Sequence, residues 1–279
     1  MIVALHSAPE GFLKSSPPYA SSELFSLVRE AAFLGFKCFQ VGPLSDFVDI
    51  DGKRLRRILD RYDMECNVHI GGLYDAKKFA ITEEEYERVQ KEIHHGIKLC
   101  REITSTLVSF HPPFFTTRNL EDKELLSKAK TRFFKLVKKE VESAFNNGIK
   151  MALETFCYPP FIFNGLRDFM QFVSYFPSTK LGVLLEVGHI YQAKLNLDEA
   201  VLRFKSRLSD IHVHDATLQE DFRKATHLPV GRGNIDFSHL IRILREVNYD
   251  GWLTLEIHGS EGEIVESKQF LENLIRITA

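Results

Sequence analysis

Histidines and glutamates stand at the ends of apolar runs throughout this chain. Imidazole nitrogens and carboxylate oxygens can hold a divalent cation, and a carboxylate can also carry a proton during a reaction. A lone histidine at such a position usually hydrogen-bonds in the core, so the prediction of a metal site depends on convergence. Carboxylates brought together repel one another, and a cation would resolve that conflict. The residues at the run ends are His6, Gln40, His69, His111, Glu154, Glu186, His212 and Glu256.

Two local spacings strengthen this interpretation. Glu186 and His189 are three residues apart directly after an apolar run, which lets a carboxylate and an imidazole reach one centre. His212 and His214 are two residues apart, and a strand would point both to the same face. One of these two histidines would be a ligand, and the other a supporting or substrate contact.

The elements that must position these residues alternate along the chain. Short β-rich runs are each followed by a longer stretch with helical periodicity. The expected strands are Ile2–Leu5, Lys37–Val41, Glu65–Ile70, Thr106–Phe110, Ile149–Leu153, Leu181–Leu185, Asp210–Val213 and Trp252–Ile257. The expected helices are Ser22–Leu34, Lys53–Arg61, Thr82–Glu102, Asp122–Asn147, Leu166–Tyr175, Asp198–Phe204, Phe237–Val247 and Val265–Ile277.

Eight strand–helix pairs predict a single (β/α)8 TIM barrel that takes residues 1–279 as one domain. A doubly wound open sheet is the competing arrangement. A barrel places the carboxyl ends of all eight strands on one rim, where active sites are built. The polar run ends listed above would then converge.

The composition sets broad limits on the class of protein. The chain is 44% hydrophobic and 27% charged with a net charge of −2, which is ordinary for a globular protein and gives no support for a dedicated nucleic-acid binder. No apolar run approaches the roughly 18 residues of a membrane span. The four cysteines form no CxxC pair, so we expect reduced thiols in a cytoplasmic protein. The sequence leaves the oligomeric state open, with a homo-oligomer among the options.

The ordered set of motifs resembles the xylose isomerase-like TIM barrels, which include sugar isomerases, ketose 3-epimerases and endonuclease IV. The resemblance runs from Ile2 to the final helix. It is carried by His69, His111-Pro112, Leu153-Glu154-Thr155, Glu186-x-x-His189, His212-x-His214-Asp215, His227-x-Pro-x-Gly-x-Gly-x-Ile-Asp-Phe and Leu255-Glu256.

The resemblance to the epimerase branch implies a divalent metal (Mn²⁺, Mg²⁺, Co²⁺ or Zn²⁺) and a small-molecule sugar substrate, a ketose or polyol, phosphorylated or not. The metal ligands it implies are Glu154, Glu186, His212 and Glu256. Glu154 and Glu256 would also act as the catalytic acid and base on opposite sides of the sugar. Proton transfer would then pass through an enediolate stabilised by the metal.

Two positions depart from the epimerase pattern. Glu186 stands where the family usually has aspartate, and His227 stands where the 3-epimerases carry arginine. The expected substrate contacts are His189, His227, His214 and His6. Three cations near the seventh strand, Arg223, Lys224 and Arg232, could bind a substrate phosphate or be solvated surface.

An endonuclease IV-like phosphodiesterase that cleaves at apurinic sites is the alternative, and only this alternative implies a nucleic-acid partner. His69, His111, His189 and His227 match its additional metal ligands, but Ala225 stands where it has an aspartate. If His69 and His111 bind metal, a second ion bridged by Glu154 would join the single ion of the epimerase pattern. A metal-bearing barrel that binds a ligand without turnover is a third class.

Overall fold

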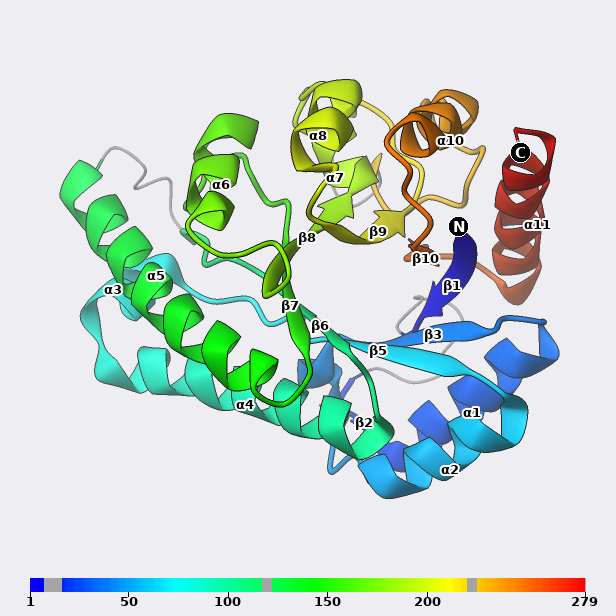
Figure 1. The fold of residues 1–279 in the computed structure, drawn as a ribbon, viewed down its shortest axis with the longest axis horizontal. Helices are drawn as coiled ribbons and strands as arrows, with labels where there is room; N and C mark the ends of the chain where they lie inside the picture. The colour runs from blue at the N-terminus through cyan, green and yellow to red at the C-terminus, as the bar shows by residue number, and fades with distance from the viewer. Residues whose placement is uncertain (8–16, 117–121, 220–224, 279) are drawn as a thin grey trace.

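Eight parallel strands close into a barrel in the computed structural model, which describes residues 1–7, 17–116, 122–219 and 225–278. Their order around the barrel is β1-β10-β9-β8-β7-β6-β5-β3, and helices lie around its outside (Figure 1). The predicted (β/α)8 barrel is therefore confirmed, and the open sheet is excluded. The strands are β1 Ile2–His6, β3 Cys38–Val41, β5 Glu65–His69, β6 Leu107–Phe110, β7 Lys150–Glu154, β8 Leu181–Glu186, β9 Leu208–Val213 and β10 Trp252–Leu255.

The outer helices each bury one apolar face against the strands, as their periodicity predicts. Several begin at a side chain that caps the first turn. Thr82 accepts a hydrogen bond from the backbone N–H of Glu85, and Asp236 accepts one from His239. The helices are α1 Ser21–Phe33, α2 Gly52–Tyr62, α4 Glu83–Ile103, α5 Lys123–Phe145, α6 Gly165–Ser174, α8 Leu197–Phe204, α10 Phe237–Glu246 and α11 Glu261–Ile277.

Two boundaries differ from the sequence prediction for identifiable reasons. The last strand ends at Leu255 rather than Ile257, because the backbone N–H of His258 donates to the loop residue His227 instead of a neighbouring strand. Helix α11 starts four residues earlier than predicted, because Ser260 and Glu263 form a reciprocal capping box.

Short elements that the sequence analysis did not predict lie in the loops after the strands. They are the paired strands β2 Tyr19–Ala20 and β4 Phe47–Val48, the 3₁₀ turn Leu44–Asp46, and the helices α3 Ala76–Ile81 and α7 Val187–Gln192. Helix α7 matters most for the site, since it begins directly after β8 and carries His189.

Polar side chains are buried inside the carboxyl-terminal half of the barrel. Gln40, Ser109, Asp210 and Thr254 are all almost fully inaccessible to solvent. Buried polar groups are costly unless each finds a partner. Their presence beneath the rim marks this end of the barrel as the region to examine. No helix in the described ranges is long and apolar enough to cross a membrane.

Candidate metal centre and active site

The carboxyl ends of the strands bring the predicted residues to one rim. His6, His69, Glu154 and Glu186 are the last residues of β1, β5, β7 and β8. His212 lies within β9, while His111, His214 and Glu256 follow β6, β9 and β10 closely. The side chains form four overlapping groups in which the ligand atoms lie within 4.8 Å of one another.

The first group consists of Glu186, His212 and Glu256. The Nδ1 atom of His212 lies 2.9 Å from Glu186 Oε2 and 2.6 Å from Glu256 Oε2. On its other side, His212 Nε2 lies 2.8 Å from the amide oxygen of Gln40. An amide oxygen only accepts, so Nε2 carries a proton. The lone pair of Nδ1 then faces two carboxylates, and a proton or a metal cation must lie among the three acceptors.

The second group consists of His69, His111 and Glu154. The Nε2 atoms of the two histidines are 3.1 Å apart, and Glu154 Oε2 lies 2.9 Å from His111 Nε2. His69 Nδ1 is 2.9 Å from Ser109 Oγ, whose hydroxyl donates to the carbonyl of Val68. Because the serine oxygen therefore accepts, Nδ1 of His69 carries the proton and its Nε2 lone pair points into the group.

Glu154, Glu186 and His189 form the third group, which connects the first two. His189 Nδ1 lies 3.8 Å from Glu154 Oε1. The four ligands expected for a single ion thus do not share one group. Glu186, His212 and Glu256 lie together, while Glu154 lies between them and the His69–His111 pair.

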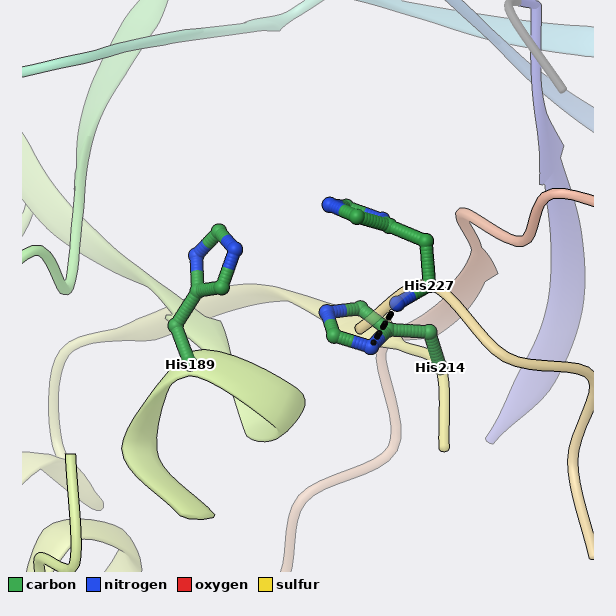
Figure 2. A group of neighbouring side chains, drawn as sticks. All are labelled: His189, His214 and His227. Carbon is green, nitrogen blue, oxygen red and sulfur yellow. Dashed lines mark hydrogen bonds between the residues drawn. The ribbon is translucent and has the colours of Figure 1, made fainter. Parts of the chain in front are cut away.

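The fourth group contains three histidines, His189, His214 and His227 (Figure 2). The ring of His227 stacks on that of His214 with centroids 4.2 Å apart, and the backbone N–H of His227 donates to His214 Nδ1. His227 has a left-handed backbone with φ of 52°. Its Nδ1 donates to the carbonyl of Glu256, so its Nε2 has a lone pair available to a ligand.

Nearby carboxylates favour the positively charged form of three imidazoles, those of His212, His111 and His214. Burial alone lowers the pKa of His212, but Glu256 and Glu186 raise it well above its ordinary value. Against the same burial, Glu154 raises the pKa of His111, and Glu186 raises the pKa of His214. Protons thus occupy positions that a divalent cation would occupy in their place.

Four other rim imidazoles, His6, His69, His189 and His227, are neutral at physiological pH. Burial lowers the pKa of His6 and of His189 to about 4, and burial together with His214 lowers the pKa of His227 to about 3. Burial and the neighbouring His111 hold the pKa of His69 well below its usual range. Neutral imidazoles can accept a hydroxyl hydrogen bond or bind a metal without first losing a proton.

Four residues that contact the site were given no supporting role by the sequence analysis. Ser109 and Asp210 each lie two residues before a rim histidine, so strand alternation could have indicated that they point the same way. Thr155 Oγ1 accepts from the backbone N–H of Glu186. The ring of Phe156 lies 4.8 Å from both His111 and His189, and no spacing in the sequence indicates this contact.

The backbone N–H groups of Gly231 and Gly233 stabilise their own loop by donating to Asp215, and so do not point to a phosphate site. The carboxylate of Asp215 accepts from the backbone N–H groups of Gly231, Gly233 and Ile235, and a Cβ atom at Gly233 would collide with it. Arg232 is exposed and pairs with Glu266. Arg223 and Lys224 lie outside the described residues.

The donor set fits a divalent metal. Because His212 Nε2 carries the proton, the lone pair of its Nδ1 points at the carboxylates of Glu186 and Glu256. Ser109 accepts from His69 Nδ1, so the lone pair of His69 Nε2 points at His111 and Glu154. Imidazole nitrogen with carboxylate oxygen suits Zn²⁺ and Mn²⁺ in particular. Hydrogen bonds that orient a ligand from behind are typical of metal sites.

Comparison with solved structures identifies the same barrel in proteins of several activities. A D-tagatose 3-epimerase-like protein superposes with a TM-score of 0.81 and 22% identity, covering 100% of this chain and 98% of that one. A family 2 AP endonuclease from Brucella melitensis superposes with a TM-score of 0.71 and 14% identity, covering 98% and 99%. At these identities the likeness shows the fold alone.

Sequence relatives match most of the chain. A Methanocaldococcus jannaschii protein of uncharacterized function is 26% identical over 233 residues, which are 81% of this chain and 75% of that protein. An inosose dehydratase from Clostridium botulinum is 21% identical over 251 residues, or 82% and 80% of the two chains. The family model described as xylose isomerase-like TIM barrel matches residues 28–274. The chain therefore belongs to the xylose isomerase-like TIM barrel family.

Proposed function

We propose that this protein is a divalent-metal-dependent sugar isomerase or epimerase that moves a proton at a carbon next to a carbonyl. The observation that carries the proposal is the group Glu186–His212–Glu256 with Glu154 across from it. Glu154 is the last residue of β7 and Glu256 follows β10, strands that β8 and β9 separate, so the two carboxylates approach from different sides. A ketose bound between them would meet one proton carrier on each face.

The metal would be held by Glu186, His212 and Glu256, with Glu154 as a further ligand. A bound divalent ion supplies positive charge that stabilises the negative charge developing on substrate oxygens. Glu256 and Glu154 then act as base and acid on the substrate carbon. A second ion would be held by His69, His111 and Glu154.

The substrate contacts are assigned to the neutral imidazoles of His6, His189 and His227, and to His214. His227 Nε2 would accept a hydrogen bond from a substrate hydroxyl, because the Nδ1–H group already donates to the carbonyl of Glu256. The ring of Phe156, which stacks on Phe161 with centroids 4.1 Å apart, offers an apolar wall beside His189. Such a wall packs against the C–H face of a sugar and limits water near the reacting carbon.

The similarity to a D-tagatose 3-epimerase-like structure supports this assignment at the level of fold. Metal-dependent phosphodiester cleavage at an abasic site is the second candidate. The observation in its favour is the additional pair of histidine-rich groups, His69–His111–Glu154 and His189–His214–His227. Against it, the position two before His227 holds the fully buried Ala225, which offers no ligand.

Solvent deuterium exchange tests the proposal. Protein purified without chelator is assayed for metal content and then incubated in D₂O with a panel of ketoses and ketose phosphates. We expect deuterium to enter a carbon next to the carbonyl only when metal is present. Fully metal-loaded protein that exchanges none of the panel but nicks an abasic duplex would establish the hydrolytic function instead.

A further inference from the structure

We propose that Asp210 and Gln40 determine which nitrogen of His212 faces the metal group, and so act as positioning residues for that ligand. The inference rests on the metal site of the proposed function and on no particular substrate. It concerns a chain of hydrogen bonds inside the barrel, beneath the rim, that links β3 to β9.

This series of hydrogen bonds starts at the carboxylate of Asp210, which accepts from every partner that it contacts. Asp210 Oδ1 accepts from the hydroxyl of Thr254 and from the backbone N–H of Ile211, each at 2.8 Å. Asp210 Oδ2 accepts from the side-chain amide of Gln40 at 2.7 Å. An ionised carboxylate cannot donate, so the NH₂ group of Gln40 must face Asp210.

That orientation decides the state of His212. With its NH₂ group directed at Asp210, Gln40 presents its oxygen to His212 Nε2 at 2.8 Å, and Nε2 must donate. Nδ1 is then the nitrogen that faces Glu186 and Glu256. The hydrogen bond from Gln40 to Asp210 thus fixes the amide so that His212 Nε2 must donate to its oxygen. This second hydrogen bond strengthens the attraction of His212 Nδ1 for a cation.

Because these hydrogen-bonded side chains are buried, it matters which group in each hydrogen bond is the donor. Gln40, Asp210, His212 and Thr254 are each fully inaccessible to solvent. Water cannot replace a missing partner there, and a buried carboxylate is costly to keep. If these hydrogen bonds only joined β3 to β9, Gln40 could present either its oxygen or its NH₂ group to His212. Only the role of His212 as a metal ligand requires that Gln40 present its oxygen.

Asp210→Asn is a sharp test, because it keeps every hydrogen bond and reverses two of them. The asparagine oxygen stays where Thr254 and Ile211 donate, so its NH₂ group faces Gln40 and turns that amide around. Gln40 then donates to His212 Nε2, and the proton of His212 moves to Nδ1, toward the carboxylates. Gln40→Met, which removes the acceptor without adding charge, is the second variant.

Thr254→Val is the matched control. It removes one buried hydrogen bond to Asp210 and leaves the donor-to-acceptor direction of the other hydrogen bonds unchanged. A merely structural role predicts that Thr254→Val and Asp210→Asn act alike on thermal stability and that neither weakens metal binding selectively.

The measurements are Zn²⁺ affinity at pH 8, by competition with a chromophoric chelator, and the ¹⁵N spectrum of the histidines in zinc-loaded protein, with His212 assigned from a His212→Gln variant. We expect the wild-type His212 proton on Nε2. Asp210→Asn should weaken zinc binding about 10- to 100-fold, the usual effect of removing support behind a ligand, while Thr254→Val stays within about threefold.

A wild-type His212 proton on Nδ1, zinc affinity of Asp210→Asn equal to wild type, or wild-type protein that binds no zinc would each overturn the inference. Wild-type protein that binds zinc but exchanges no deuterium into ketoses would remove only the proposed isomerase. The zinc affinities and the ¹⁵N spectrum would still decide the role of Asp210 and Gln40.

Discussion

Glu256 combines two tasks in the proposed site, because its carboxylate contacts His212 and lies at the rim where substrate would bind. Burial opposes its ionisation, but His6 and His212 hold the pKa of Glu256 well below its ordinary value. Glu256→Gln keeps the shape and one oxygen and removes the proton carrier. We expect turnover to fall about 10²–10⁴-fold while substrate binding is partly retained. Steady-state kinetics and deuterium exchange measure both effects.

Lost metal would imitate a lost base, so the Glu256→Gln result requires metal content measured in the same preparations. Glu154→Gln should behave alike if the two carboxylates work on one carbon. Glu266→Gln is the matched control, since Glu266 is an exposed partner of Arg232. A metal-replete Glu256→Gln protein with wild-type turnover would exclude Glu256 as the proton carrier.

At the scale of elements, helix α11 packs against β1 and β10, the strand that leads to Glu256. Its first turn depends on a capping box in which the Glu263 carboxylate accepts from the backbone N–H of Ser260 at 2.8 Å. Ser260→Ala should lower the free energy of unfolding by about 1 kcal/mol, the usual cost of losing a cap. Urea unfolding at pH 7 measures this change.

The same capping box gives a pH dependence with a definite sign. Hydrogen bonds from Ser260 lower the pKa of Glu263 below the ordinary 4.5. A carboxyl group whose pKa is lower in the folded state stabilises the fold at any pH above its pKa in the unfolded chain. This contribution is lost as the pH falls through its pKa in the folded protein. Glu263→Gln should therefore destabilise at pH 7, and its effect should shrink as the pH falls below 4.5 and through the lowered pKa of folded Glu263. An equal effect at pH 7 and below that lowered pKa would contradict the ionic origin.

The sequence predicted the eight strands to within about two residues, because short apolar runs end at polar rim residues. Short elements escaped prediction. Helix α7 has six residues and follows β8 directly, which is too short for helical periodicity to register. The strands β2 and β4 pair although 26 residues lie between them, so only the folded chain reveals them.

The convergence of these histidines and glutamates on one rim was predictable, but its division into groups was not. The types and order of the histidines and glutamates indicate a metal centre. Which of them share an ion depends on loop geometry, such as the left-handed backbone of His227. It also depends on contacts between distant residues, such as Gln40 with Asp210, which are 170 positions apart. Neither follows from local spacing.

For the whole molecule, the four cysteines provide a test of packing. All are buried, and burial is the main cause that raises the pKa of Cys38, Cys100 and Cys157 to about 12 and the pKa of Cys66 further. The thiolate is the reactive form, so native protein should react slowly with a disulfide reagent at pH 8. We expect fewer than one thiol per chain to be modified quickly, and four in denaturant. Rapid modification of the native chain would contradict this packing.

Metal binding should stabilise the entire barrel rather than the rim alone. The proposed ligands come from four consecutive strands of the closed sheet, β7 to β10, and the unfolded chain does not hold them together. A ligand that binds only the folded state adds about 2.7 kcal/mol at a free concentration 100 times its dissociation constant. Thermal unfolding of chelator-treated protein should therefore shift upward with added Mn²⁺ or Zn²⁺, and keep rising as the concentration increases.

Two variants show whether that shift comes from the proposed ligands. Glu186→Gln removes a charged oxygen from the group around His212 and should abolish most of the shift, whatever it does to the metal-free protein. Glu266→Gln should retain the full shift, because Glu266 is 68% exposed and pairs only with Arg232 among the described residues. Equal shifts in the two variants would mean that the metal binds elsewhere, since a cation held at the rim must respond to the loss of one of its carboxylates.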